Sequence, residues 1–159
     1  MPKVINKEFN IEGNPIDKFI SLVSKIKPDQ VTLVPDSIDA VTSNAGWDTI
    51  KNKNFLKEVI SEFKKNGIRT SIFVDPELKF IEGAKETGTD RIELYTESYA
   101  TNFEKGNLGE INKYIKASSL ANKLGMKTNA GHDLNLQNIN YFVSKLPFLD
   151  EVSIGHAIV

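Results

Sequence analysis

The stretch "FLKEVISEFKKNGIRTSIFVDP", Phe55 to Pro76, decides the architecture of the chain. Its first part repeats apolar residues at helical spacing, which predicts an amphipathic helix over 55–66 that ends at Gly67. The β-branched and apolar run that follows predicts a buried strand over 68–75. Pro76 then occupies a position that suits the start of another helix. A helix, a strand and a second helix therefore follow one another within this short segment.

The same alternation extends along the chain in both directions. It predicts strands over 7–12, 30–35, 68–75, 91–96, 126–130 and 151–155. It predicts helices over 14–26, 55–66, 76–87, 108–124 and 136–146. Consecutive strands joined by helices run parallel, because parallel neighbours need a crossover connection of roughly a dozen residues or more. The predicted fold class is therefore α/β.

Two architectures fit an α/β chain, and the sequence favours the barrel. A doubly wound dinucleotide fold would carry a glycine-rich fingerprint after its first strand, whereas "NIEGNPID" has a single glycine there. We therefore predict a (β/α)8 TIM barrel with about six of its eight strands in this chain. Residues 1–159 are expected to form one partial barrel domain, whose open sheet edges would leave backbone groups unpaired.

The composition is that of a soluble globular protein. The chain has 159 residues, of which 40% are hydrophobic and 26% charged, and its net charge is −1. The 20 basic residues are dispersed among 21 acidic ones, so we expect no nucleic-acid partner. The absence of cysteine excludes disulfides, thiolate zinc sites and a cysteine nucleophile. No apolar run approaches the roughly 18 residues of a membrane span, so we expect a cytoplasmic protein without a membrane partner.

In a TIM barrel the chemistry lies where strands end, so polar residues at those positions are candidates. Glu12 follows an apolar strand and is either an ionisable group with a partner or a solvated loop residue. Asp75, before Pro76, is expected to cap a helix, and Thr96 is expected merely to finish a strand. Glu93 alternates with apolar neighbours and is predicted to point into the barrel, as a paired core residue or with a direct role.

The two histidines of the chain occupy similar glycine corners, in "NAGHDLN" and "SIGHAI". His132 and His156 each follow a glycine at the end of a predicted strand. Late strands of such barrels frequently bind phosphate through backbone N–H groups at glycine turns. Each histidine taken alone is more typical of a structural residue. The two corners together are consistent either with structural roles or with a site for phosphate binding and proton transfer. No ligand spacing such as His-x-x-x-His is present, so a metal is not expected.

Seven segments in order resemble the pyridoxine 5'-phosphate synthase family: "FNIEGN", "VTLVPD", "AVTSNAGWD", "GIRTSIFVDP", "RIELYTESYA", "NAGHDLN" and "SIGHAI". The resemblance covers essentially the whole chain. It implies a TIM barrel enzyme, a transferase of vitamin B6 (pyridoxine) biosynthesis. The implied reaction condenses 1-deoxy-D-xylulose 5-phosphate with 3-amino-2-oxopropyl phosphate to form pyridoxine 5'-phosphate. It implies no metal or organic cofactor, small phosphorylated substrates, and a cytoplasmic homo-oligomer, an octamer in the family.

The resemblance also assigns roles to individual residues. Glu12 corresponds to an acid/base catalyst, and His132 to a proton donor. Substrate-binding positions correspond to Thr42, Asp133, Gly155 and His156. Thr42 would contact the deoxyxylulose phosphate, whereas Gly155 and His156 would hold the phosphate of the aminoketone. Asp133 replaces a glycine found in many members, so its backbone N–H is retained while its carboxylate must point away from a phosphate.

The family motifs "N-I-D-H" and "H-L-R-E-D-R-R-H" do not occur in the chain, and the helices that follow the last strand are also missing. By this alignment the chain corresponds to the third to eighth strands of the barrel. The alternative hypothesis is a catalytically inactive fragment or remnant of the enzyme that keeps a phosphate-binding edge.

Overall fold

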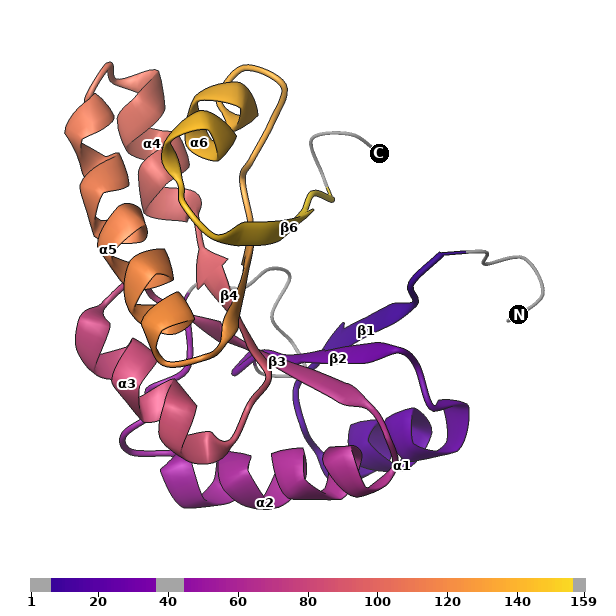
Figure 1. The fold of residues 1–159 in the computed structure, drawn as a ribbon. Coiled ribbons are helices and arrows are strands. Elements are labelled where there is room, and N and C mark those ends of the chain that lie inside the picture. The colour runs from indigo at the N-terminus through magenta and orange to yellow at the C-terminus, as the bar shows by residue number, and fades with distance from the viewer. Residues whose placement is uncertain (1–6, 37–44, 156–159) are drawn as a thin grey trace.

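The computed structural model describes residues 7–36 and 45–155, and a single curled sheet forms its centre (Figure 1). The sheet has six strands: β1 (Asn10–Gly13), β2 (Gln30–Leu33), β3 (Arg69–Val74), β4 (Arg91–Tyr95), β5 (Lys127–Gly131) and β6 (Leu149–Ser153). They lie side by side in sequence order, and every neighbouring pair is parallel. The predicted α/β class and the six predicted strands are confirmed. A complete eight-stranded barrel is not seen in these residues.

Helices connect the strands and cover the convex face of the sheet (Figure 1). They are α1 (Asp17–Ile26), α2 (Lys53–Lys65), α3 (Leu78–Thr87), α4 (Glu97–Glu104), the 3-10 turn η2 (Leu108–Glu110), α5 (Ile111–Lys123) and α6 (Ile139–Lys145). Gly88 follows α3 with a φ of 83°, a left-handed conformation that glycine adopts without steric cost. In the described part of the chain, no helix is long and apolar enough to cross a membrane.

Helix α4 is the element that the sequence pattern did not predict. Its eight residues follow β4 directly, so the segment lacks the longer apolar repeat by which the other helices were recognised. Tertiary contacts stabilise it instead. Tyr99 and Ala100 are buried, and the Tyr99 hydroxyl donates to the Asn138 carbonyl at 2.7 Å. The helix thereby connects the end of β4 to the loop that follows β5.

Alternation along the strands sorts apolar from polar side chains. The residues that face the helices are fully buried and apolar, among them Val31, Leu33, Ile72, Ile92 and Leu94. Burying each large side chain of this kind contributes about 1.5–3 kcal/mol to folding. Their neighbours in the sequence face the concave side and are mostly polar. The predicted inward orientation of Glu93 agrees with this alternation, since Ile92 and Leu94 are in the apolar core.

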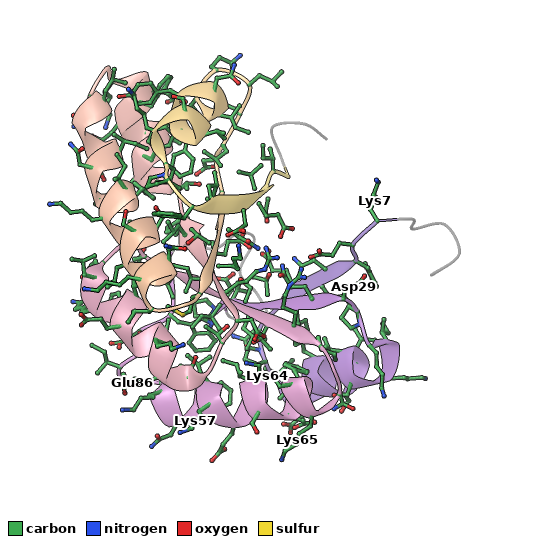
Figure 2. All side chains as sticks on the ribbon, viewed as in Figure 1. Lys7, Asp29, Lys57, Lys64, Lys65 and Glu86 are labelled. Carbon is green, nitrogen blue, oxygen red and sulfur yellow. The ribbon has the colours of Figure 1, made fainter. Side chains whose placement is uncertain are left out.

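Hydrogen bonds and ion pairs connect the polar side chains of the concave face. Arg91 Nη1 donates to Asn129 Oδ1 at 2.9 Å and pairs with Glu151 Oε2 at 3.1 Å. Arg69 Nε donates to Gln30 Oε1 at 2.8 Å. By contrast, Lys57, Lys65 and Glu86 extend from the outer helices into solvent (Figure 2). Ionisable groups are therefore concentrated in two places, the solvated outer surface and the inner face of the sheet.

Candidate active site

The carboxyl ends of the strands bring Glu12, Asp36 and His132 within electrostatic reach of one another. The three residues come from the end of β1, the segment after β2 and the end of β5. Glu12 retains contact with solvent. Nevertheless, the pKa of Glu12 is raised. The larger cause is partial burial of the carboxyl group, and the second is the negative charge of Asp36. His132 acts in the opposite direction and lowers the pKa. Glu12 is therefore part of a charged cluster on the concave face, and not an isolated loop glutamate.

Glu93 is a second carboxyl group in this cluster, and it is almost fully buried. Its side chain is 2% exposed, and Oε2 has no hydrogen-bond partner among the described residues. Burial, followed by the charge of Glu12, raises the pKa of Glu93 to about 8, although a hydrogen bond with Ser153 opposes the shift. The carboxyl is thus mainly protonated near pH 7. A neutral acid beside a more exposed carboxylate is an arrangement suited to general acid and base catalysis.

The end of β5 brings His132 close enough to Glu12 to lower its pKa. The ring of His132 lies edge-on to Tyr95, with 4.9 Å between centroids and 89° between planes. Its Nδ1 lies 3.1 Å from Asp133 Oδ2. The backbone at both residues is left-handed, with φ of 89° at His132 and 56° at Asp133. Since such conformations are uncommon outside glycine, this corner is held in place by its surroundings.

The glycine before the histidine is required for a reason that the sequence did not reveal. A Cβ atom at Gly131 would lie 2.3 Å from Glu93 Oε1 and 3.1 Å from Ser153 Cβ. The φ of Gly131 is not left-handed, so its requirement is one of space. Gly155 differs, because among the described residues a Cβ atom there would meet no atom within 4 Å. The two glycine corners, alike in sequence, are therefore unlike in their packing.

Two predicted roles at strand ends are wrong. Asp75 does not cap a helix, because α3 begins at Leu78 after Glu77; the Asp75 carboxylate accepts the Gly46 N–H at 3.2 Å. Thr96 does more than finish a strand. It precedes α4, and its hydroxyl donates to the backbone of β5. In both cases the partner is distant in sequence, so local pattern could not identify it.

The structure describes only some of the other predicted site residues. Thr42 and His156 lie outside the described residues. Asp133 and Gly155 are exposed at the ends of β5 and β6, on the same rim of the sheet as Glu12 and His132. Tyr95 and Ser153 belong to this rim but were not predicted. The alternation that placed Glu93 inside would also have placed Tyr95 there, two residues further along β4.

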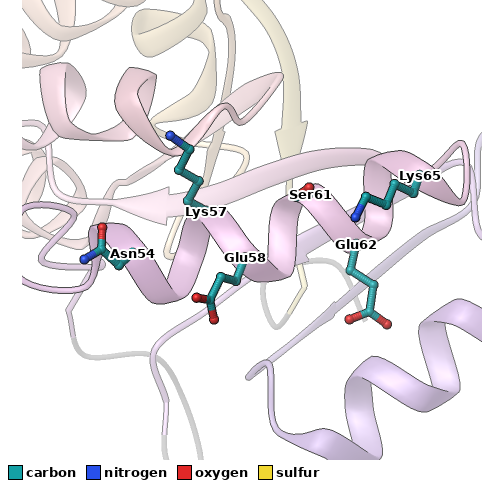
Figure 3. A pocket seen from close by; sticks show the side chains of 6 residues that line it. All are labelled: Asn54, Lys57, Glu58, Ser61, Glu62 and Lys65. Atoms are coloured by element: carbon teal, nitrogen blue, oxygen red, sulfur yellow. The ribbon is translucent and has the colours of Figure 1, made fainter.

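The remaining surface features do not compete with this rim. In residues 7–36 and 45–155, no group of His, Asp and Glu side chains is positioned to hold a metal ion. A groove of about 530 Å³ runs along the outer face of α2, lined by Asn54, Lys57, Glu58, Ser61, Glu62 and Lys65 (Figure 3). All of its lining residues come from one helix, and four of the six are charged, two lysines and two glutamates. The groove is the solvated outer face of α2.

Comparison with known proteins gives a consistent result. A family model described as "Pyridoxal phosphate biosynthesis protein PdxJ" matches residues 1–159. Curated relatives named pyridoxine 5'-phosphate synthase include those of Christiangramia forsetii and Flavobacterium johnsoniae, each 64% identical over 156 residues. These matches cover 98% of this chain and 66% of each relative, so the chain spans about two thirds of their length. The synthase of Cytophaga hutchinsonii is 58% identical over 159 residues, which are 67% of that protein.

Solved structures add evidence on the fold alone. A structure of the pneumococcal virulence factor StrH, studied for N-glycan recognition and hydrolysis, matches with a TM-score of 0.51 and 12% identity. The match covers 80% of this chain and 53% of that chain. The family match over all 159 residues, together with these sequence identities, shows that the chain belongs to the family of the pyridoxal phosphate biosynthesis protein PdxJ.

Proposed function

We propose that this protein functions as a pyridoxine 5'-phosphate synthase, and that its curled sheet is part of an eight-stranded β/α barrel. The substrates are 1-deoxy-D-xylulose 5-phosphate and 3-amino-2-oxopropyl phosphate, and no metal or organic cofactor takes part. The observation that carries the proposal is the convergence of Glu12, Glu93 and His132 on one rim of the sheet. Family membership supports the choice of reaction.

The roles proposed for these residues follow from their protonation and position. Condensation of an amine with a carbonyl, followed by loss of water and phosphate, requires protons to be added and removed in order. Glu12 is solvated on one side and has a raised pKa, which suits a group that gains and loses a proton. His132 serves as the proton donor. Buried Glu93 supplies a neutral acid that donates a hydrogen bond to charge developing on the substrate.

Phosphate binding is proposed for the backbone at the ends of β5 and β6, with Thr42 and His156 as further contacts. The backbone N–H groups of Asp133 and Gly155 are the proposed donors, and no other described residue crowds the Cβ position of Gly155. The Asp133 carboxylate lies beside His132 Nδ1, so it is oriented toward the ring. We also propose a cytoplasmic homo-oligomer, an octamer as in the family.

The experiment is a turnover assay for pyridoxine 5'-phosphate, with the chain tested beside the longer relative from Flavobacterium johnsoniae. In an active protein, Glu12→Gln is expected to lower turnover by about 100-fold or more, the scale of a lost general acid or base. Glu58→Gln, on the exposed face of α2, serves as the matched control and is expected to leave turnover unchanged. Wild-type turnover in a folded Glu12→Gln variant would remove Glu12 from the mechanism. No turnover by the chain while the relative is active would favour the inactive remnant.

A further inference from the structure

Thr96 contacts both peptide groups that flank His132. It follows β4 and is fully buried. Its Oγ1 donates to the Gly131 carbonyl at 2.7 Å and also lies within hydrogen-bond distance of the His132 carbonyl. Its own N–H donates to the Gly131 carbonyl at 3.1 Å. A threonine before a helix usually caps that helix with its hydroxyl, but here the hydroxyl is turned toward β5.

These contacts act on the backbone angles of His132. The Gly131 carbonyl belongs to the peptide plane before His132, and the His132 carbonyl belongs to the plane after it. The φ and ψ of His132 describe how these two planes are rotated relative to each other. A hydroxyl that is shared between both carbonyl oxygens therefore restrains both angles. It does so at a residue whose left-handed φ costs about 1–2 kcal/mol for a side chain other than glycine.

Helix α4 also restrains the Asp133 side of the corner, through Asn138. Asn138 Nδ2 donates to the Asp133 carbonyl at 3.1 Å, and its Oδ1 accepts the Asn135 N–H at 2.9 Å. The Asn138 carbonyl in turn accepts the Tyr99 hydroxyl of α4 at 2.7 Å. Residues Thr96 and Tyr99 thus connect α4 to the corner on both sides of Asp133. This arrangement explains how two successive left-handed residues persist.

We propose that Thr96 is a positioning residue that sets the direction of the His132 ring by fixing the backbone on both sides of it. The inference rests on the proposed function, in which His132 donates a proton. A ring displaced by about 1 Å from its acceptor is enough to reduce turnover by as much as 100-fold. Thr96 itself lies behind the peptide backbone and is not proposed to touch the substrate.

The test compares Thr96→Val, which removes the donor, with Thr96→Ser, which keeps it. Thr128→Val is the matched control, because Thr128 is equally buried in β5 and its hydroxyl has no partner among the described residues. The readout in the 159-residue chain is the nuclear Overhauser effect between the ring protons of His132 and Tyr95, which reports whether the two rings remain in contact. The chain has two histidines, so the His132 signal is identified by its loss in His132→Asn. Thr96→Val is expected to lose this contact, whereas Thr96→Ser and Thr128→Val keep it.

Turnover measured on the same variants provides the second readout. We expect Thr96→Val to lower the turnover number by about 10-fold to 100-fold with little change in KM, and Thr96→Ser to restore it. If Thr96→Val does not fold, Thr96→Ala removes the donor without adding a methyl group in the hydroxyl position. A folded donor-free variant that retains the His132–Tyr95 contact would overturn the proposal. Absence of turnover in the wild-type chain would count against the proposed function, while the NMR comparison would still decide the role of Thr96.

Discussion

At the scale of single residues, the site combines carboxyl groups in different environments. Glu12 keeps contact with solvent, whereas Glu93 is enclosed by the sheet and by Gly131. Burial is the larger cause of the raised pKa at both groups; the charge of Asp36 adds to it at Glu12, and the charge of Glu12 adds to it at Glu93. The two groups therefore remain distinguishable by their access to water. This difference supports an exchangeable proton at Glu12 and a retained proton at Glu93.

Glu93→Gln should change how stability depends on pH. Because the pKa of Glu93 is raised to about 8 in the folded protein, its contribution to stability is fully present below about pH 4.5 and is lost as pH rises to 8. Each unit of pKa difference corresponds to about 1.4 kcal/mol. Denaturant unfolding from pH 5 to 9 should therefore show a stability loss in the wild type that is smaller in Glu93→Gln. An identical pH dependence in both proteins would contradict the assignment.

Gly131→Ala should destabilise the fold because its Cβ atom would overlap Glu93 Oε1. Overpacking of this kind costs typically about 1–3 kcal/mol, and it should also displace the Glu93 carboxyl. The matched control is Gly109→Ala, whose Cβ atom would meet only Asn107 Oδ1 at 3.4 Å. Thermal and denaturant unfolding of both variants measures the difference. Equal stability of Gly131→Ala and wild type would show that the corner has room to adjust.

At the scale of elements, a repeated contact joins strands in pairs at the end of the sheet opposite the site. Aspartates at the starts of β2, β4 and β6 each accept a backbone N–H from within the preceding strand or from the residue just before it. The pairs are Asp29 with Phe9 at 2.8 Å, Asp90 with Thr70 at 2.9 Å, and Asp150 with Thr128 at 3.0 Å. Each carboxylate supplies an acceptor near the point where the ladder of that strand pair begins. These contacts help to fix the register that aligns the carboxyl ends of the strands.

Asp90→Ala should lower the free energy of unfolding by about 1–3 kcal/mol, since it leaves the Thr70 N–H without its acceptor. Burial opposes ionisation of Asp90, but hydrogen bonds from Lys64 and Thr70 together outweigh it and lower the pKa. The stabilisation is therefore present above the ordinary pKa near 3.8 and is lost as pH falls through the lowered value. Denaturant unfolding of the wild type and Asp90→Ala at pH 7 and at pH 3 measures this difference in free energy. Asp17→Ala, at an exposed position, serves as the control. A variant effect that does not shrink in acid would contradict it.

At the scale of the whole molecule, the sheet encloses polar groups on its concave side and apolar groups on its convex side. The helices cover the apolar side (Figure 1). Arg69, Arg91 and Glu151 belong to the polar network of the other side. In the described residues, β1 pairs only with β2 and β6 only with β5. Each therefore presents one edge with backbone groups available for another strand.

These edges should make the isolated 159-residue chain self-associate. We expect the average mass from analytical ultracentrifugation to rise with protein concentration, because edge strands can pair between molecules. The same preparation should show a broad thermal transition. A monomer at all concentrations with a sharp cooperative melt would contradict this expectation.

The sequence alone determined the succession of parallel strands and helices, the inward orientation of Glu93 and the family. Periodic apolar residues determine which face of each strand and helix is buried, and this is a local property. The motifs "FNIEGN", "NAGHDLN" and "SIGHAI" were sufficient to indicate the family, which the comparisons then showed. Glu12 and His132 were also predicted, as polar residues at strand ends.

Only the tertiary structure decided how these residues act on one another. Helix α4, the acceptor role of Asp75 and the link from Thr96 to His132 depend on partners about 30 residues or more away in sequence. The space at Gly131 likewise depends on Glu93 from the adjacent strand. A local pattern records whether a side chain is buried but not which distant atom it meets. Which distant atoms a side chain contacts is decided only when the parallel strands align and their carboxyl ends come together.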